Sequence, residues 1–345
     1  MSAQEGSATS PASLWPLITG YMPARVVHVA AELGIADLLA TEAKTADALA
    51  QEIDTAPVPL RRLLRALASI GLVEERESGR FALTAAGSQL RSNVPGSMRN
   101  IALMFGGERA WRSWGELLHS VRTGESGTRR VYGVGSFEYL AAKPEQAAIF
   151  NAAMAENTGR ITELLVSTYD FSQFRNIVDV GGGNGALMAA ILAANAGVLG
   201  TVFDLPSGMA QAQQNLADAG VAARCEIIAG DFFRSVPEAA DAYVLKYVIP
   251  DWGDAQSIAI LSNCRDAMHE AGKILLIERV MPERMEATPI HQRIAMADMN
   301  MLAMPGGQQR TEQEYRDLFS SAGLSLERIT PLPGSEISVI EAKRG

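Results

Sequence analysis

The sequence predicts an α/β protein with a Rossmann-like C-terminal domain on a seven-stranded sheet and a helical, winged-helix-like N-terminal domain. From residue 176 onward, short apolar strands alternate with amphipathic helices, the pattern of a parallel sheet covered on both faces. The last two strands have only a Pro-Gly turn between them, so one sheet edge is expected to end in a reversed hairpin. Residues 13–92 instead contain helices and one small hairpin.

Length, composition and charge favour a folded chain and exclude several classes of partner. The 345 residues suggest two domains, taking roughly 150 residues for each. Hydrophobic residues make up 48% and charged residues 20%, close to ordinary globular usage, which excludes a disordered chain. With 30 Lys and Arg against 39 Asp and Glu, the net charge of -9 repels phosphates and anionic lipids, so we expect no nucleic-acid and no membrane partner.

The cysteines and the N-terminus favour a cytoplasmic protein. Cys225 and Cys264 form no C-x-x-C or Cys/His pattern, so neither a disulfide framework nor a metal site is expected. Residues 1–12 lack the basic start and apolar run of a signal peptide, and we expect them to be a disordered tail.

The N-terminal domain, expected over residues 13–100, has the element order of a winged helix. Helices are expected at residues 14–39, 45–52 and 59–70, and strands at 72–75 and 80–83. The third helix carries Arg61, Arg62 and Arg65, as a DNA-recognition helix would. The acidic balance of the chain favours the other interpretation, an otherwise all-helical dimerisation domain that has the winged shape and does not bind DNA.

Residues 101–170 are expected to form a helical linker rich in bulky side chains. These include Met104, Phe105, Trp111, Trp114, Phe137, Tyr139, Phe150 and Met154. Most should be core, and a subset is expected to line an apolar pocket for an aromatic ligand.

The C-terminal domain, expected over residues 171–345, holds the predicted sheet. Its strands are expected at Asn176–Val180, Gly200–Asp204, Cys225–Ala229, Ala242–Val248, Lys273–Glu278, Leu324–Ile329 and Ile337–Glu341. No helix separates the last two strands, so they are expected to pair as the antiparallel edge hairpin.

Three successive strand ends carry residues suited to adenosine. The first strand runs into a G-x-G-x-G loop over residues 181–185, whose glycines permit a tight turn and close approach of a ligand. The second ends in Asp204, an acid that can accept both ribose hydroxyls. Asp231 and Phe232 follow the third and suit an adenine amino group and ring. Taken singly, the two acids suit helix caps equally well.

With these motifs the chain resembles the S-adenosylmethionine-dependent O-methyltransferases of the caffeic acid type. The matching segments are residues 178–185 (VDVGGGNG), 203–206 (FDLP), 230–233 (GDFF), 245–246 (LK) before 251–252 (DW), and 306–307 (GG) before 310–312 (RTE). The resemblance implies a class I methyltransferase fold, a homodimer formed through the N-terminal domain, and S-adenosylmethionine as cofactor. The implied cofactor contacts are Gly181, Gly183, Asp204, Asp231, Phe232 and Lys246, and the implied substrate contacts are Phe150, Met154, Asn157, Trp252, Met299 and Met301.

Two catalytic positions of that family have changed. The family's general base is a His directly before Asp-Trp, and here Pro250 precedes Asp251. Glu278 matches a second family acid, whereas the acid of the Gly-Gly-x-Glu-Arg segment is replaced by Gln309. Proline has no ionisable side chain, and a glutamine cannot accept a proton as a carboxylate does.

The predicted function is methyl transfer to a hydroxyl of an aromatic or polyketide-like small molecule. Asp251, Glu278 and His291 are the candidates to replace the missing base, unless an acidic acceptor ionises by itself. C-methylation of an activated ring carbon stays open. The alternative function is hydroxylation or cyclisation by an enzyme that keeps the cofactor, as the resemblance implies for members lacking the base; a noncatalytic or DNA-binding regulator is the third.

Overall fold

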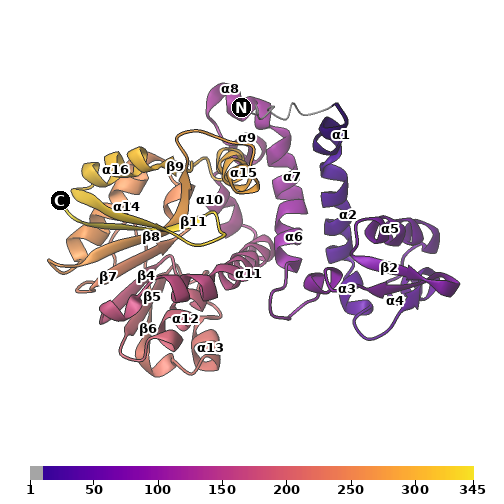
Figure 1. Ribbon diagram of the computed structural model, residues 1–345, viewed down its shortest axis with the longest axis horizontal. Helices are drawn as coiled ribbons and strands as arrows, with labels where there is room; N and C mark the ends of the chain where they lie inside the picture. The colour runs from indigo at the N-terminus through magenta and orange to yellow at the C-terminus, as the bar shows by residue number, and fades with distance from the viewer. Residues whose placement is uncertain (1–10) are drawn as a thin grey trace, which may run out of the picture. The chain divides into compact units, whose positions relative to one another are not determined.

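The computed structural model describes residues 11–345 (Figure 1). The chain divides into two compact units, with the division between Trp111 and Arg112. Among the described helices, none is both long enough and apolar enough to cross a membrane.

The N-terminal unit begins with helices that glycines interrupt. Its helices are α1 (Pro11–Thr19), α2 (Tyr21–Glu32), α3 (Ile35–Leu38), α4 (Ala46–Glu52), α5 (Pro57–Ser69) and α6 (Arg99–Gly106), with 3₁₀ turns at Glu77–Gly79 and Gly87–Leu90, and α7 (Glu108–Gly115) crosses the division. The single helix predicted over residues 14–39 is wrong. The chain breaks at Gly20 and again at Gly34, whose φ of 64° lies in the left-handed region that ends a helix.

The predicted wing is confirmed and gains one strand. Strands β2 (Val73–Arg76) and β3 (Arg80–Leu83) pair antiparallel, and the short β1 (Lys44–Thr45) joins β3 to give the order β1-β3-β2. The connection turns through Ser78 and Gly79, both at positive φ (62° and 69°), as a tight hairpin requires.

Apolar side chains from helices and wing form the core of this unit. Fully buried members are Ile35, Leu49, Leu64, Leu67 and Phe81. Two of the arginines on α5 face acids of the same unit, because Arg61 pairs with Asp47 at 3.1 Å and Arg65 with Glu75 at 3.2 Å. Their charges are therefore partly neutralised within the unit.

The C-terminal unit contains the predicted seven-stranded sheet. Its strands are β4 (Asn176–Val180), β5 (Leu199–Asp204), β6 (Cys225–Ala229), β7 (Ala242–Lys246), β8 (Lys273–Met281), β10 (Leu324–Pro331) and β11 (Ile337–Arg344), and the short β9 (Arg310–Thr311) pairs beside β8. The order β10-β11-β8-β7-β4-β5-β6 is parallel from β8 to β6, and β11 runs antiparallel to both β8 and β10. The predicted edge hairpin is thus confirmed. The predicted end of the fourth strand at Val248 is wrong, because Tyr247 adopts a φ of 57° and ends β7 at Lys246.

Helices cover both faces of this sheet (Figure 1). The helices of the C-terminal unit are α8 (Leu117–Thr123), α9 (Gly127–Tyr132), α10 (Ser136–Ala141), α11 (Pro144–Thr168), α12 (Ala186–Ala194), α13 (Ala212–Asp218), α14 (Asp254–Ala267), α15 (Pro289–Ala303) and α16 (Glu312–Ser321), with 3₁₀ turns at Phe171–Gln173, Ala222–Arg224 and Ile249–Asp251. Residues of α11, α12 and α13 pack on one face around Val202 and Ile277. Residues of α14 and α16 pack on the other face around Phe203 and Leu276. The carboxyl ends of the parallel strands are left for the site.

The core of the N-terminal unit gives a stability prediction. Leu64→Ala removes a fully buried side chain on α5, and we expect the free energy of unfolding, measured by urea denaturation, to fall by about 2–5 kcal/mol. Val58→Ala on the same helix, where the side chain is 71% exposed, is the matched control and should change it by less than about 0.5 kcal/mol. Equal effects of the two substitutions would contradict the assigned core.

Candidate active site

The glycine loop after β4 is held open by positive backbone φ angles. Gly181, Gly183 and Gly185 have φ of 72°, 54° and 73°, which L side chains rarely adopt. The N–H groups of Gly181 and Gly182 both donate to the carbonyl of Phe203, at 2.8 and 3.2 Å. A Cβ on Gly183 would meet no atom within 4 Å. The loop is therefore fixed on β5 while space stays free beside Gly183.

Asp204 lies at the carboxyl end of β5 and contacts this loop. Its Oδ2 accepts from the N–H of Gly183 at 2.8 Å, and its Oδ1 accepts from the N–H of Leu205 at 2.6 Å. Burial raises the pKa of Asp204, and the two backbone hydrogen bonds act in the opposite direction. A carboxylate oxygen can accept more than one hydrogen bond, so both oxygens keep acceptor capacity for a ligand.

Asp231 and Phe232 follow β6 at the same edge. Asp231 Oδ1 accepts from the N–H of Phe233 at 2.9 Å, so this acid also orders its own turn. Asn263 on α14 donates to the carbonyl of Phe232 at 2.8 Å and fixes that residue from behind. The ring of Phe232 lies 3.9 Å from where a Cβ on Gly181 would be. The aromatic ring and the glycine loop are thus neighbours.

Beneath the loop lie two ionisable groups of opposite type, the buried Asp179 and the half-buried Lys246. Asp179 is 1% exposed, and its Oδ2 has no hydrogen-bond partner among the described residues. Burial raises the pKa of Asp179 to about 7, although the charge of Lys246 opposes that shift. Burial likewise lowers the pKa of Lys246 to about 8, against the attraction of Asp179 and Glu278. Both shifts disfavour the charged forms, as expected in a medium of low polarity.

Glu278 on β8 is a fully buried carboxyl below the turn that carries Pro250. Its Oε1 accepts from the N–H of Val248 at 3.0 Å, and its Oε2 has no partner in the described part of the chain. Burial, reinforced by the negative charge of Asp251, raises the pKa of Glu278 well above its ordinary value. The environment therefore favours the neutral, protonated carboxyl.

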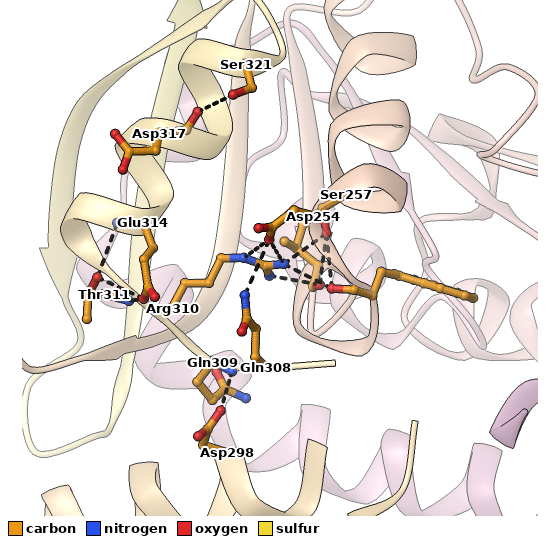
Figure 2. A network of polar contacts seen from close by, with 12 residues as sticks. Asp254, Ser257, Asp298, Gln308, Gln309, Arg310, Thr311, Glu314, Asp317 and Ser321 are labelled. Atoms are coloured by element: carbon orange, nitrogen blue, oxygen red, sulfur yellow. Dashed lines mark hydrogen bonds and ion pairs between the residues drawn. The ribbon is translucent and has the colours of Figure 1, made fainter. Parts of the chain in front are cut away.

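Pro250 and Gln309, the two positions that differ from the family pattern, lie on two segments that contact each other. Pro250 is buried in the 3₁₀ turn Ile249–Asp251, and its carbonyl accepts from the N–H of Gln308 at 2.9 Å. Gln309 is 6% exposed; its N–H donates to Asp298 on α15 at 2.7 Å. Figure 2 shows the contact between Gln309 and Asp298, and beside it Arg310, which reaches from the same segment toward Asp254 and Ser257.

An aromatic cluster joins the predicted substrate side to the cofactor side. Phe137 on α10 stacks on Trp252 with centroids 5.2 Å apart, and its edge meets Phe150 on α11 at 6.2 Å. Trp252 in turn meets Phe233 at 4.7 Å and Phe232 at 6.2 Å. Three of the predicted site residues are therefore brought together in one cluster.

The remaining predicted substrate residues are half-buried on two helices. Met154 and Asn157 lie on α11 with Phe150, and Met299 and Met301 lie on α15. The side chain of Asn157 interacts with the hydroxyl of Tyr247, whose pKa burial raises to about 12. The candidate base His291, at the start of α15, uses its Nδ1 to accept from the N–H of Glu286 at 3.0 Å.

Sequence reasoning gave no role to three residues that shape this region. Phe137 was one bulky side chain among many, and nothing in its spacing identifies it as the partner of Trp252. Tyr247 lies between the cations of Lys246 and Arg279, 4.3 and 5.1 Å from its ring centroid, and no local pattern indicates its positive φ. Arg310 belongs to the matching segment 310–312, but the sequence does not indicate that its side chain is buried, at 1% exposure.

The buried carboxyl of Asp179 predicts a pH dependence of stability. Because its pKa is raised from 3.8 to about 7, the folded state keeps a proton that the unfolded state loses. This contribution to stability is present at low pH and is lost as the pH rises from about 4 to about 7. In urea denaturation, the unfolding free energy of the wild type should fall over this range by up to about 4 kcal/mol more than that of Asp179→Asn.

The matched control for this experiment is Asp218→Asn, because Asp218 is exposed on α13. It should retain the wild-type pH profile. Parallel profiles for the wild type and Asp179→Asn would contradict the prediction.

Comparison with known proteins gives the family of both units. A model of the O-methyltransferase dimerisation domain matches residues 15–93, and a model of the O-methyltransferase domain matches residues 114–325. The phenazine O-methyltransferase of Lysobacter antibioticus is 41% identical over 338 residues, which cover 98% of this chain and 97% of that protein. The O-demethylpuromycin-O-methyltransferase of Streptomyces alboniger is 40% identical over 330 residues, which cover 94% of this chain and 87% of that protein.

A solved structure agrees with these relatives. The crystal structure of an O-methyltransferase from neocarzinostatin biosynthesis, in complex with S-adenosylmethionine and 2-hydroxy-5-methyl naphthoic acid, is 31% identical with a TM-score of 0.81. The match covers 99% of this chain and 100% of that one. The two domain matches, the sequence relatives and the shared fold agree, and the cofactor follows from them. The chain belongs to the S-adenosylmethionine-dependent O-methyltransferase family.

Proposed function

We propose that this enzyme methylates a hydroxyl of an aromatic or polyketide-like small molecule that is acidic enough to ionise without a basic side chain. The observation that carries the proposal is Pro250, buried in the turn where the family has its basic His. A phenol with a pKa near 10 needs roughly 4 kcal/mol to ionise at pH 7. An acceptor acidified by a conjugated carbonyl or quinone needs less, so the loss of the base is tolerated. The phenazine and naphthoic acid in the relatives' names support an aromatic acceptor.

The glycine loop and the neighbouring strand ends fit S-adenosylmethionine. We propose that Gly181, Gly183, Asp204, Asp231, Phe232 and Lys246 hold it. The open space beside Gly183 and the spare acceptor capacity of Asp204 support this assignment. The cofactor supplies a methyl group made electrophilic by the sulfonium charge. The chain's own contribution is to bind and orient both reactants, which alone can lower a barrier by about 7–11 kcal/mol.

On the acceptor side, the aromatic cluster supports a flat apolar ligand. We propose that the acceptor lies among Phe150, Met154, Asn157, Trp252, Met299 and Met301. Stacked and edge-on rings prefer a further aromatic ring as partner, and thioethers adapt to its outline.

The two proposed catalytic carboxyls have different environments. The burial of Glu278 and the charge of Asp251 together favour a neutral Glu278, whose protonated carboxyl is a hydrogen-bond donor below the turn. Asp251 lies in the same 3₁₀ turn as Pro250 and is the second proposed catalytic carboxyl.

We further propose that the protein works as a cytoplasmic homodimer. The dimerisation domain supports the dimer, as does a row of exposed apolar side chains on α1 and α2. The row is Leu14, Trp15, Leu17, Ile18, Tyr21 and Met22, each at least 49% exposed. Cys225 and Cys264 are free thiols, which suits a reducing compartment.

The proposed ribose contact predicts the effect of Asp204→Asn. Replacing one acceptor oxygen by an amide should weaken S-adenosylmethionine binding by roughly tenfold or more, measured by titration calorimetry. Asp241→Asn is the matched control, because Asp241 also accepts two backbone N–H groups, from Arg175 and Asn176, at the opposite end of the strands. It should leave the affinity unchanged, and equal losses in both variants would contradict the contact.

The proposed reaction is tested by comparing the wild type with Pro250→His on phenolic acceptors of graded pKa. The wild type should release S-adenosylhomocysteine with equimolar methylated product, faster on the more acidic acceptors. A restored base should accelerate the less acidic acceptors by about 10²-fold or more and the acidic ones little. Pro333→His, at an exposed turn between β10 and β11, is the control and should behave as the wild type.

Two results would contradict this proposal. If the wild-type turnover rate did not depend on the pKa of the acceptor, the inference drawn from Pro250 would be wrong. Methyl transfer by Pro250→His alone would mean that the native protein uses its cofactor site for other chemistry, such as hydroxylation or cyclisation.

A further inference from the structure

The segment that follows α15 docks against the turn that carries Pro250. Gln308 donates a hydrogen bond to the Pro250 carbonyl, and the backbones of the two segments approach closely at Gly307. A Cβ on Gly307 would lie 1.9 Å from the carbonyl oxygen of Pro250, so only glycine permits this approach. The two segments are 50 or more residues apart in the chain and meet through their backbones.

Arg310 fastens this contact from inside the protein (Figure 2). Its side chain is 1% exposed, and its donors form five hydrogen bonds. Nη1 donates to the carbonyl of Ile249 at 3.3 Å, and Nη2 donates to the carbonyl of Trp252 at 3.0 Å. Nε and Nη2 donate to Asp254 Oδ1 at 3.2 and 2.8 Å, and Nη2 also reaches Ser257 Oγ at 3.4 Å.

These partners enclose the position of the missing base. Ile249 and Trp252 flank Pro250 and Asp251, so the guanidinium holds the turn from both sides through its main chain. A guanidinium presents donors in a rigid planar fork, and an ammonium cannot reproduce that geometry. Gln309 precedes Arg310 directly, so the same anchor fixes the second changed position.

We propose that Arg310 is a positioning residue for methyl transfer, because it locks the turn 249–252 and the segment 307–310 into one rigid wall of the acceptor site. The proposal rests on the proposed function for its kinetic consequence. Arg310 does not touch the reactants, since its donors are used within the protein. Its effect is geometric, and a displacement of about 1 Å in a reacting geometry can cost about 10²-fold in rate.

The test uses the full-length enzyme and three variants. Arg310→Lys removes the fork and keeps the charge. Gly307→Ala pushes on the Pro250 carbonyl without touching Arg310, which keeps the test valid if the first variant fails to fold. Arg316→Lys on α16 is the matched control, because Arg316 also pairs with an acid, Glu312 at 2.5 Å, but on the exposed surface.

Three quantities are measured: kcat per S-adenosylmethionine-binding site, the affinity for S-adenosylmethionine, and hydrogen exchange in residues 247–257. We expect Arg310→Lys and Gly307→Ala to lower kcat by about 10- to 100-fold, to keep cofactor affinity within about twofold, and to speed exchange in 247–257 selectively. Arg316→Lys should change none of these. In the Arg310→Lys background, Pro250→His should no longer accelerate the less acidic acceptors, because its imidazole is not held in place.

Different failures have different readouts. The positioning role would be overturned if Arg310→Lys sped hydrogen exchange in residues 247–257 but left kcat unchanged. It would also be overturned if hydrogen exchange in residues 247–257 did not change. If cofactor affinity and stability fell in proportion to kcat, Arg310 would have only a structural role, and the proposed positioning role would be overturned. A wild type that transfers no methyl group to any acceptor would overturn the proposed function instead, while exchange in 247–257 still reports whether Arg310 holds the turn.

Discussion

The whole candidate site depends on the parallel pairing of β4 with β5 and β7. This pairing brings the carboxyl ends of three strands to one edge, where the chain must leave the sheet and expose backbone groups. The glycine loop satisfies part of that need by donating to the Phe203 carbonyl, and Asp204 accepts from the loop in return. Loop and strand end therefore hold one another before any ligand arrives.

Charge burial is the second constraint on this edge. Asp179, Lys246 and Glu278 lie below the loop and the turn, where the surroundings disfavour ionisation of each group. Burying such groups reduces the stability of the fold. The low polarity that shifts their pKa values also strengthens electrostatic interactions with a charged ligand. A positive charge held near these groups would favour the ionised form of the two carboxyls.

Much of this fold could be predicted from the sequence, because local sequence signals mark where its strands begin and end. β4 and β6 begin and end at the predicted residues, since apolar runs stop at glycines or polar turns. β7 ends early because Tyr247 takes a backbone conformation that no neighbouring residue indicates. The cofactor motif was visible as a spacing within the chain, whereas the partners of Arg310 lie 53 to 61 residues away and follow only from the tertiary fold.

Several hydrogen bonds to its main chain hold the turn at Pro250 in place. Arg310 grips the carbonyls of Ile249 and Trp252, and Gln308 donates to the carbonyl of Pro250. None of these bonds depends on which side chain stands at position 250. A substitution at that position can therefore alter the chemistry available to the enzyme while these bonds of the surrounding frame persist. A scaffold of this kind permits descendants to diversify their reactions without first solving a new folding problem.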